Sequence, residues 1–549
     1  MTPAPASDFW PETADLSLVF SPDRTVFRHP DGTASTGYDL LRAAHRTAAL
    51  LPDAPIVSLC QDVWHFTVLF LATILRGQSV LLSSDRTPER LLQLVASHRA
   101  VCVMLEGETA TEELPVGTLV LPAPDGSGTD QPDNPVIPFD REVATVFTSG
   151  STGQPVAYAK KWGALVIRSI VARELLDPEE TASSLIGTVP PYHMYGFETL
   201  VCQAVHTRSL VATGPTAYPA DWQKMLGLTT TPRILITTPL QMRALLQADL
   251  DTPPITRIVS AAAPLSEDLA RRSEETLHTV VTEIYGATEI GSIAIRRTTH
   301  EPVWQLYDTI NLHMHDDSVT VSAPGAPDIE LADLVERIDA RRFRLIGRRN
   351  DMVKIAARRA SLSALNTILT NLPGVEDGAF VPPNTDDGHT MRMQVLAVAP
   401  GVSATDILAG LRKQIDPVFL PRTITFVEAM PRNSVGKLTA GALREFATTV
   451  MEGRIIGEIA FPANHPALPG HFPGLPVVPG ALLLDCGLDL AGLSPAKIDQ
   501  VKFLRPVRPE ETLCFRLRRE SGRLTLSARV AHTANAPLVL RAIMRTQSD

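Results

Sequence analysis

The chain has 549 residues, of which 44% are hydrophobic and 20% are charged, and this composition is typical of a folded soluble protein. A chain of this length exceeds what one hydrophobic core normally serves, so we expect two to four domains. The formal net charge of −10 argues against a general binder of nucleic acid or of anionic membranes. Small acidic ligands must therefore be held by local loops and helix ends.

The five cysteines are scattered, with neither a CxxC pair nor metal-ligand spacing, which predicts a reduced, cytoplasmic protein. The first residues, MTPAPASDFWPETADLSL, have no basic start and no apolar core, so we expect no signal peptide. The apolar run Phe66–Leu75 is too short to span a bilayer and predicts a buried helix. Lysine is scarce, with eight residues against 42 arginines, so a conspicuous lysine is a stronger functional candidate than usual.

From about residue 35 to residue 120, helix-like apolar stretches alternate with short β-rich runs. The helical stretches and the strands that follow them are Leu40–Leu51 and Ile56–Leu59, His65–Leu75 and Ser79–Leu82, and Leu91–Ala96 and Val101–Leu105. This alternation predicts βαβ units and a parallel sheet. The Pro/Gly/Asp-rich stretch Pro122–Pro135 is expected to be a loop rather than a domain linker, because the same rhythm resumes after it.

The α/β pattern continues to about residue 284, with strands expected at Val143–Phe147, Leu185–Val189, Ile234–Thr237, Ile255–Ser260 and Val280–Ile284. Helices are expected at Ala164–Leu176, Pro239–Asp249 and Glu267–Leu277. A basic turn at Arg344–Asp351 then opens a smaller unit of mixed helix and strand that ends near Phe446. We interpret the change of character at this turn as a domain boundary.

The last segment, from about Ile455 to Asp549, opens with a strand and contains an apolar helix. It closes with alternating strands at Thr512–Arg518, Arg523–His532 and Leu538–Arg545. This pattern predicts one helix wrapped by an antiparallel sheet. The whole chain is therefore expected to be a multidomain protein of α/β and α+β class.

A Gly-rich polar loop follows the strand at Val143–Phe147. Its residues are Thr148, Ser149, Gly150, Ser151, Thr152 and Gly153. The glycines permit a tight turn, and hydroxyls with backbone N–H groups can surround phosphate oxygens. No Gly-Lys-Ser/Thr follows, so the loop does not have Walker spacing. A polar surface loop is the alternative interpretation.

Two further motifs fit the handling of a nucleotide. In Tyr285-Gly286-Ala287-Thr288-Glu289, the tyrosine can stack on a purine, Thr288 can bond a phosphate, and Glu289 can hold Mg²⁺. In Gly436-Lys437, a flexible ammonium on an exposed loop can reach a carboxylate–phosphate centre. The alternatives are a plain strand-to-turn connection and a solvated lysine.

In this order and at these separations, the three motifs resemble the adenylate-forming superfamily of acyl-CoA synthetases and aryl-acid ligases. The resemblance covers residues 10–447 and implies a large N-terminal domain at 1–347 and a small mobile domain at 348–450. It implies that ATP and Mg²⁺ convert a carboxylic acid into an acyl-AMP, with Lys437 stabilising the developing charge. A phosphopantetheine thiol, on CoA or a carrier protein, then takes the acyl group.

Other segments match the same family. Tyr192 and His193 fall in the acyl-pocket motif, and Ala261 and Ala262 fall in the segment that lines the pocket floor. The resemblance assigns ribose contacts to Asp333 and Arg348, and places Asn350 at the hinge between the domains.

Three positions depart from the family pattern, of which the mildest is Asn350, where the hinge usually has Asp or Lys. Val156 follows Pro155 where a lysine is usual, and Lys160 or Lys161 are the candidates to replace that lysine. Ala357 stands where a glycine normally lets the pantetheine arm approach closely, which bears on the thiol acceptor more than on adenylation.

The last segment carries its own candidate site. His471, in a His-Phe-Pro-Gly turn, and Asp485 are a base and an acid fourteen positions apart, with Pro479-Gly480 between them. Residues 454–549 resemble the hotdog-fold 3-hydroxyacyl-carrier-protein dehydratases. The resemblance implies that His471 takes the C2 proton, Asp485 helps the 3-hydroxyl to leave, and the Gly480 N–H contacts the thioester oxygen. It also implies a homodimer through this domain.

We expect the pKa of Asp485 to be raised by the apolar run Leu482–Leu484 beside it.

Together the two resemblances predict a ligase fused to a dehydratase, an arrangement similar to fusions in aryl polyene biosynthesis, with an acyl carrier protein as partner. An aryl acid and a medium-chain fatty acid both fit the residues around His193. Three alternatives stay open: a hotdog domain that only dimerises or docks a carrier, a hotdog thioesterase, and a chain that has lost adenylation through Val156.

Overall fold

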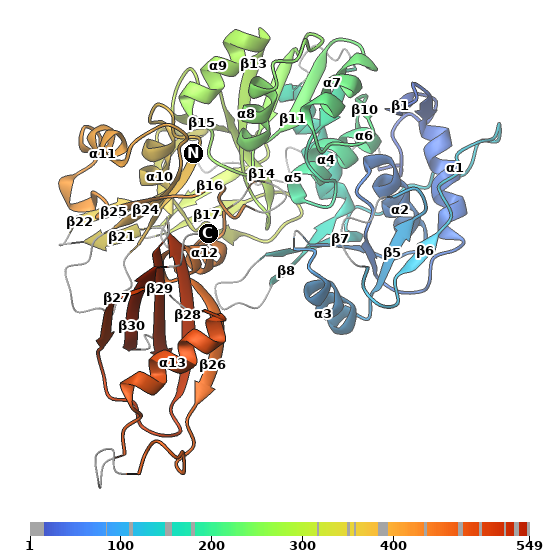
Figure 1. Ribbon diagram of the computed structural model, residues 1–549. Coiled ribbons are helices and arrows are strands. Elements are labelled where there is room, and N and C mark those ends of the chain that lie inside the picture. The colour runs from blue at the N-terminus through green and yellow to red at the C-terminus, as the bar shows by residue number, and fades with distance from the viewer. Residues whose placement is uncertain are drawn as a thin grey trace. The chain divides into compact units, whose positions relative to one another are not determined.

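The computed structural model places most of the chain in two compact units, each described here by itself (Figure 1). The first unit runs to Met352 and includes 361–367 and 434–437, and the second contains 353–360, 368–433 and 438–549. The structure describes residues 16–83, 85–108, 114–148, 156–176, 182–315, 318–348, 352–355, 358–382, 393–432, 436, 438–469, 476–493, 497–520, 523–531 and 537–545.

A six-stranded sheet forms one part of the first unit. Its order is β6-β5-β3-β4-β7-β8, and all neighbours are parallel except the last pair. The strands are β3 (Ile56–Ser58), β4 (Val80–Leu82), β5 (Val101–Leu105), β6 (Leu119–Leu121), β7 (Glu142–Thr148) and β8 (Val156–Lys161). The helices between them are α1 (Gly37–Ala48), α2 (Val63–Leu75) and α3 (Pro88–His98). The predicted βαβ alternation is confirmed.

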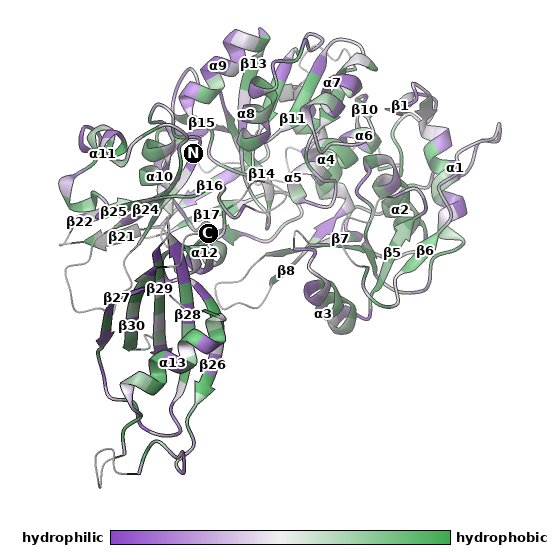
Figure 2. Cartoon of the chain, viewed as in Figure 1, coloured by the Kyte–Doolittle hydropathy of each residue, from purple (hydrophilic) through white to green (hydrophobic). Residues whose placement is uncertain are grey.

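Helix α2 is the buried helix that the apolar run at 66–75 predicts. Nearly all its side chains are buried, and most of the helix is coloured as hydrophobic in Figure 2. Asp62 caps it by accepting hydrogen bonds from the backbone N–H groups of Trp64 and His65. Within the described part of the chain, no helix combines the length and the apolar character needed to cross a bilayer.

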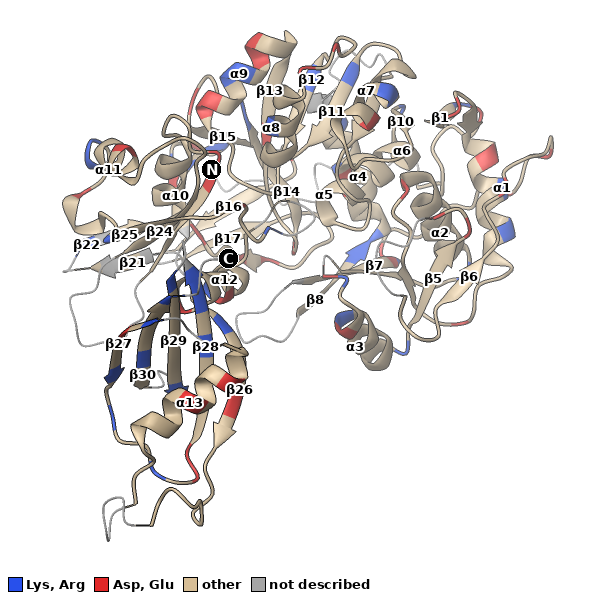
Figure 3. Ribbon diagram, viewed as in Figure 1, with Lys and Arg blue, Asp and Glu red and all other residues tan. Residues whose placement is uncertain are grey.

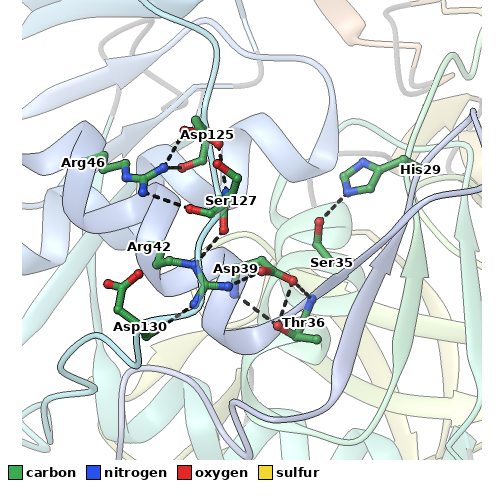
Figure 4. Close-up of polar contacts among 10 residues, drawn as sticks. His29, Ser35, Thr36, Asp39, Arg42, Arg46, Asp125, Ser127 and Asp130 are labelled. Carbon is green, nitrogen blue, oxygen red and sulfur yellow. Dashed lines mark hydrogen bonds and ion pairs between the residues drawn. The ribbon is translucent and has the colours of Figure 1, made fainter.

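The stretch Pro122–Pro135 is a loop fixed to α1 by basic side chains (Figure 4). Arg42, which is 6% exposed, donates from Nε to the Gly126 carbonyl over 2.7 Å and also contacts Asp39 and the Asp130 carbonyl. Arg46 donates to the Ser127 carbonyl over 2.9 Å. These bonds replace the strand pairing that the loop lacks, so the prediction of a loop rather than a linker is confirmed.

An eleven-stranded sheet forms the rest of the first unit's core, in the order β19-β20-β15-β14-β13-β12-β11-β9-β10-β1-β2. Strands β1, β10, β9, β11, β12 and β13 are parallel, and pairing is antiparallel beyond both ends of that set. The bounds are β1 (Thr25–Arg28), β2 (Ala34–Thr36), β9 (Ser184–Gly187), β10 (Leu210–Ala212), β11 (Arg233–Thr237), β12 (Arg257–Ser260), β13 (Val280–Ala287), β14 (Gly291–Arg296), β15 (Val303–Leu306), β19 (Asp333–Arg337) and β20 (Arg342–Arg348).

The helices of this part are α4 (Trp162–Leu176), α5 (Met194–Gly196), the π-helical segment Phe197–Cys202, α6 (Gln203–His206), α7 (Pro219–Gly227), α8 (Pro239–Gln247) and α9 (Glu267–Leu277). A small sheet of β16 (Asn311–Met314), β17 (Val319–Ser322) and β18 (Ile329–Glu330) lies beyond β15 in the chain. The predicted end of strand β13 is wrong: the strand continues past Ile284 to Ala287, because its pairing with β14 extends it. Tyr285 therefore belongs to the strand and not to the turn.

The second unit contains two sheets. One is β23 (Asp377–Val381), β24 (Gln394–Val398) and β25 (Thr423–Phe426), accompanied by α11 (Ala404–Arg412) and α12 (Ala440–Glu452). The other has the order β26-β28-β29-β30-β27 and is antiparallel throughout. Its elements are β26 (Arg454–Ala460), α13 (Gly480–Ala491), β27 (Lys497–Phe503), β28 (Thr512–Glu520), β29 (Arg523–Val530) and β30 (Leu538–Arg545). The chain passes between the two units within β21 (Met352–Ile355), β22 (Arg358–Ser361) and α10 (Leu362–Thr370).

The single helix of the five-stranded sheet packs on one of its faces. A Cβ at Gly487 would lie 2.8 Å from Leu526 and 2.9 Å from Phe515, so α13 needs a residue without a side chain to approach the sheet closely. The prediction of one helix wrapped by an antiparallel sheet is confirmed. In one chain only Leu483 and Gly487 of α13 are buried, and most of its other side chains are half-buried.

The buried His206 ring should make the stability of the first unit depend on pH. Its ring is enclosed, with Nδ1 3.0 Å from the Ser169 hydroxyl and the Trp162 ring at 4.7 Å, and burial lowers the pKa of His206 to about 3. The unfolded chain binds this proton near pH 6.5, so protonation favours unfolding as the pH falls from about 6.5 toward 3.

When the pH is lowered from 7.5 to 5, the free energy of unfolding should fall in the parent by about 2 kcal/mol more than in His206→Gln. Urea denaturation at the two pH values measures this difference. The exposed His300 supplies the control variant His300→Gln, which should keep the parent's pH dependence. Equal pH dependence in both variants would show that His206 is not buried in its neutral form.

Candidate functional site

The predicted nucleotide residues meet at the end of strand β13. The Tyr285 hydroxyl donates a 2.8 Å hydrogen bond to Oδ2 of Asp333, the carboxylate assigned to the ribose. Asp333 in turn lies directly opposite Arg348 in the pairing of β19 with β20. The structure therefore brings together three residues that are far apart in the sequence.

The Tyr285 ring is 9% exposed and packs near Trp304 and Phe343, with ring centroids 5.6 and 5.9 Å away. These contacts and the bond to Asp333 fix the strand that leads into the Thr288–Glu289 turn. Stacking of Tyr285 on a purine stays a prediction.

Lys160, at the end of strand β8, holds this turn from inside the protein. Its ammonium donates to the carbonyl of Thr288 over 3.1 Å and to that of Glu289 over 2.6 Å. The side chain is buried, and burial lowers the pKa of Lys160 to about 8, against the opposing effect of the Glu198 carboxylate. Lys161, the other candidate, instead pairs with Asp140 at the surface over 2.9 Å.

A buried ion pair fixes the far side of the same turn. Arg168 Nε donates to Glu198 Oε1 over 2.8 Å, and Glu198 Oε2 accepts hydrogen bonds from the Ser292 N–H and hydroxyl over 2.9 and 2.8 Å. Both charged side chains are about nine-tenths buried, and they border a cavity of about 20 Å³. The start of β14 is thus attached to the π-helical segment that follows the acyl-pocket motif.

Tyr195 positions the residues of the predicted acyl pocket. Its buried hydroxyl donates to the Val259 carbonyl over 2.8 Å and lies 3.3 Å from the Thr237 carbonyl, which joins the motif to β12 and β11. The same Thr237 carbonyl accepts the N–H of Ala261. Hydrogen bonds through one carbonyl therefore connect the motif that contains Tyr192 and His193 with the predicted pocket floor.

Local backbone features shape both predicted pocket segments. His193 caps α5, its Nδ1 accepting the N–H of Tyr195 over 3.3 Å. Ala262 has a φ of +70°, an uncommon conformation for a residue with a side chain, which turns the chain sharply after β12.

Tyr192 packs against the guanidinium of Arg86, a residue that no sequence motif indicates. The guanidinium carbon of Arg86 lies 3.4 Å from the centre of the Tyr192 ring, and Arg86 Nη2 donates to the Ser58 carbonyl over 2.7 Å. Burial of this group lowers the pKa of Arg86. The contact joins the six-stranded sheet to the acyl-pocket motif through a cation–π interaction.

The side chain of Glu289 suits a shared metal site. It is half-buried, and no Lys, Arg or His among the described residues lies within ion-pair distance of its carboxylate. The described residues contain no group of three His, Cys, Asp or Glu side chains that could hold a metal ion. One carboxylate together with ATP phosphates is the usual arrangement for Mg²⁺, and Glu289 fits it.

The C-terminal candidate site is partly described. Gly480 begins α13, and a Cβ there would lie 2.8 Å from the half-exposed Phe503 ring, which would have to move to make room for it. Asp485 lies on α13 and is exposed. The Leu482 and Leu484 side chains beside it are only partly buried.

Several predicted residues lie outside the part of the chain that the structure describes: Ser149, Gly150, Ser151, Thr152, Gly153, Asn350, Ala357, Lys437 and His471. For Thr148 and Arg348 the backbone is described and the side chain is not.

Sequence reasoning missed Arg86, Arg168, Glu198 and Tyr195. Glu198 did offer a signal, because it is an acid inside the apolar run Phe197–Cys202, and a carboxylate in such a run is almost never fully buried unless it is paired.

The AMP-binding enzyme family matches residues 18–326, more than half of the chain. The chain belongs to this family. A second family, the ApeI dehydratases, matches residues 447–537, which include α13 and strands β26 to β29 of the five-stranded sheet. The predicted fold class and both resemblances are confirmed: an adenylate-forming ligase fold with a C-terminal hotdog domain.

Three similar proteins illustrate the match. A 4-coumarate–CoA ligase from Cereibacter sphaeroides is 25% identical over 306 residues, which is 54% of this chain and 69% of that protein. The fatty acid–[acyl-carrier-protein] ligase MmaC of Mycobacterium marinum is 23% identical, over 75% of this chain and 95% of its own. The fold matches that of Bacillus subtilis O-succinylbenzoate coenzyme A synthetase with ATP and magnesium, with a TM-score of 0.65 at 15% identity, covering 77% of this chain and 97% of that one.

The AMP-binding enzyme therefore contains a turn whose stability depends on one buried ammonium. We expect Lys160→Met to lower the free energy of unfolding by about 2–4 kcal/mol, because two buried carbonyls lose a charged donor. Urea denaturation measures this loss. Lys161→Met removes a surface pair and should change stability by less than about 1 kcal/mol. Equal losses in the two variants would contradict the assignment.

Proposed function

We propose that the chain is an AMP-forming ligase for an aryl or fatty acid, fused to a 3-hydroxyacyl thioester dehydratase. The observation that carries the ligase half is the convergence of Tyr285, Asp333 and the Lys160-held turn within a member of the AMP-binding enzyme family. The dehydratase half is supported by the ApeI dehydratase match and by the position of Gly480 and Asp485 on α13.

In the first half-reaction, a carboxylate oxygen of the acid attacks the α-phosphorus of ATP. The bond from that phosphorus to the bridging oxygen breaks, which releases pyrophosphate and leaves acyl-AMP. Asp333 would accept hydrogen bonds from the ribose hydroxyls, and Thr288 and the loop at 148–153 would bond phosphate oxygens. The Lys437 ammonium would stabilise the charge between carboxylate and α-phosphate. Mg²⁺ held by Glu289 supplies neutralisation of the departing pyrophosphate.

In the second half-reaction, a pantetheine thiol attacks the acyl carbonyl, and AMP leaves with the electron pair of the broken C–O bond. The hinge at Asn350 would let the small domain change position between the two steps. Similarity to MmaC supports a carrier protein as acceptor, and similarity to 4-coumarate–CoA ligase supports an aryl acid.

In the hotdog domain, His471 would take a proton from C2 of a 3-hydroxyacyl thioester, and the hydroxyl at C3 would leave as water with a proton from Asp485. The N–H of Gly480, at the start of α13, would bond the thioester oxygen as negative charge develops there. A second copy of the domain would cover the open side of α13 and supply the enclosure that Asp485 lacks in one chain. We therefore propose a homodimer.

The two activities fit one assembly line. The ligase would load an aryl starter on a carrier, and after each extension and reduction the dehydratase would form one double bond. Repetition of that cycle gives an aryl polyene.

The ligase proposal is tested by ATP–pyrophosphate exchange with hydroxybenzoic, cinnamic and linear fatty acids. We expect exchange with one class, and a loss of about 10²–10³-fold in kcat in Lys437→Ala, because this ammonium acts in the transition state. ATP binding should be largely kept. Lys413→Ala, which removes an exposed lysine from the second unit, is the control and should keep full exchange. No exchange with any acid would overturn the ligase half.

The dehydratase proposal is tested by following enoyl formation from 3-hydroxyacyl thioesters. We expect His471→Ala and Asp485→Asn to reduce the rate by at least about 10²-fold, since each removes one acid–base group. Asp489→Asn, four residues further along α13, is the matched control and should keep the rate. If the parent forms no enoyl product while it still supports exchange, the hotdog domain is a dimerisation or docking module.

A further inference from the structure

Strand β8 has a lysine on the same face as Val156, where the family usually has one. The last two residues of the strand are Lys160 and Lys161, and this end of the strand is blue in Figure 3. Side chains alternate between the two faces of a strand, so Val156, Tyr158 and Lys160 share one face and Lys161 lies on the other. Val156 is exposed, whereas Lys160 is 6% exposed. The strand therefore places a lysine on the face of position 156, about 13 Å further along and inside the protein.

This face of β8 lies against the turn at 288–290, which joins β13 to β14. The Lys160 ammonium donates to the carbonyls of Thr288 and Glu289 over 3.1 and 2.6 Å. Tyr158 is near the same turn: burial raises the pKa of its phenol, and the Glu289 carboxylate raises it further. One ammonium therefore fixes two successive peptide groups, and these belong to the residues assigned to a phosphate and to Mg²⁺.

The ammonium fixes the backbone of Glu289 and leaves its carboxylate available. Lys160 bonds the Glu289 carbonyl, and within the described part of the chain no ion pair joins the ammonium to the carboxylate of that residue. Burial lowers the pKa of Lys160 to about 8, and the Glu198 and Glu289 carboxylates oppose this effect. A lysine paired with the carboxylate would compete with a cation for it. The observed arrangement keeps the charge of Glu289 for a hard cation such as Mg²⁺.

The other end of the turn is held by Glu198. Its Oε2 accepts hydrogen bonds from the Ser292 N–H and hydroxyl, and its Oε1 accepts one from Arg168. Gly291, with a φ of +98°, lets this carboxylate approach, because a Cβ there would lie 2.0 Å from Glu198 Oε1. Buried charged groups therefore hold the turn on both sides of Glu289.

We propose that Lys160 is a positioning residue for the Glu289 carboxylate, and through it for the Mg²⁺ of MgATP. This role rests on the proposed ligase function. Groups that orient a metal ligand without touching the metal typically change metal affinity by about 10–100-fold when they are lost. Lys160 acts in this way through two peptide carbonyls, whereas a lysine at position 156 would act from the phosphate loop itself.

The test measures ATP binding to the full-length protein without any acid, so that no turnover occurs. Isothermal titration calorimetry gives the Kd of ATP with Mg²⁺ and with EDTA, and the ratio of the two values is the Mg²⁺ effect. We expect Lys160→Met to reduce the Mg²⁺ effect at least about tenfold and to leave the Kd with EDTA unchanged. Lys161→Met, which removes the neighbouring surface lysine, is the matched control and should keep both Kd values.

A double variant shows whether Lys160 acts through Glu289. Glu289→Gln removes the carboxylate and should abolish most of the Mg²⁺ effect. Lys160→Met/Glu289→Gln should then bind MgATP no more weakly than Glu289→Gln, because two residues that act through one ligand are not additive. Additive losses would overturn the positioning role. If Lys160→Met does not fold, Lys160→Gln takes its place. Its amide can still donate to one carbonyl, so it should lose a smaller part of the Mg²⁺ effect, and an unchanged effect would overturn the role.

Binding also separates the positioning role from the proposed function. If the parent binds MgATP but exchanges pyrophosphate with no acid, the ligase function fails, and the ratio of Kd values still reports on Lys160. Equal weakening of ATP binding with Mg²⁺ and with EDTA in Lys160→Met would overturn the role, since the lysine would then support the fold alone. A parent that binds ATP equally well in both conditions would overturn it too.

Discussion

The buried ammonium of Lys160 is the constraint on which the nucleotide side of the protein depends. A charge with so little exposure is costly unless its hydrogen bonds are satisfied, and here the carbonyls of Thr288 and Glu289 satisfy them. The same bonds fix the backbone on which the Thr288 and Glu289 side chains stand. Because Glu198 and Arg168 fix the other side of the turn, its geometry is set before any nucleotide arrives. A preorganised turn of this kind avoids reorganisation at the moment of reaction.

The position of Lys160 also bears on Val156, which stands where the family usually has a lysine. The first strand residue after the phosphate loop is an apolar side chain, and the lysine four residues later is directed into the protein rather than left at the loop. Support for the nucleotide turn thus comes from inside the protein, through backbone carbonyls.

Much of the fold could be predicted from the sequence, because it follows from local pattern. The alternation of apolar helices with β-rich runs predicts β3 to β5 and their helices, and α9 has the predicted bounds. The end of β13 could not be predicted, since pairing with β14 decides it. The candidate site could be predicted only for residues that lie in recognisable sequence motifs. These are Tyr285, Asp333 and Glu289. Arg86 contacts Tyr192 and Arg168 contacts Glu198, and both partners are far away in the sequence. Motif spacing gives no sign of such contacts. The exposure of Asp485 likewise depends on what covers α13, and the sequence of one chain does not reveal which surface that is.

The junction at Gly453 has a mechanical consequence. Helix α12 ends at Glu452 and β26 begins at Arg454, so a single residue joins the small ligase sheet's last helix to the hotdog sheet. That residue has a φ of +94°, and a Cβ there would lie 2.5 Å from the Leu517 carbonyl, so it must be glycine. Hydrogen bonds from Arg516, Arg518 and Arg529 to residues 451–453 fix the end of the helix, so the connection is rigid. Any rotation of α12 is therefore transmitted directly to the hotdog domain, because one glycine and three arginine contacts join the two.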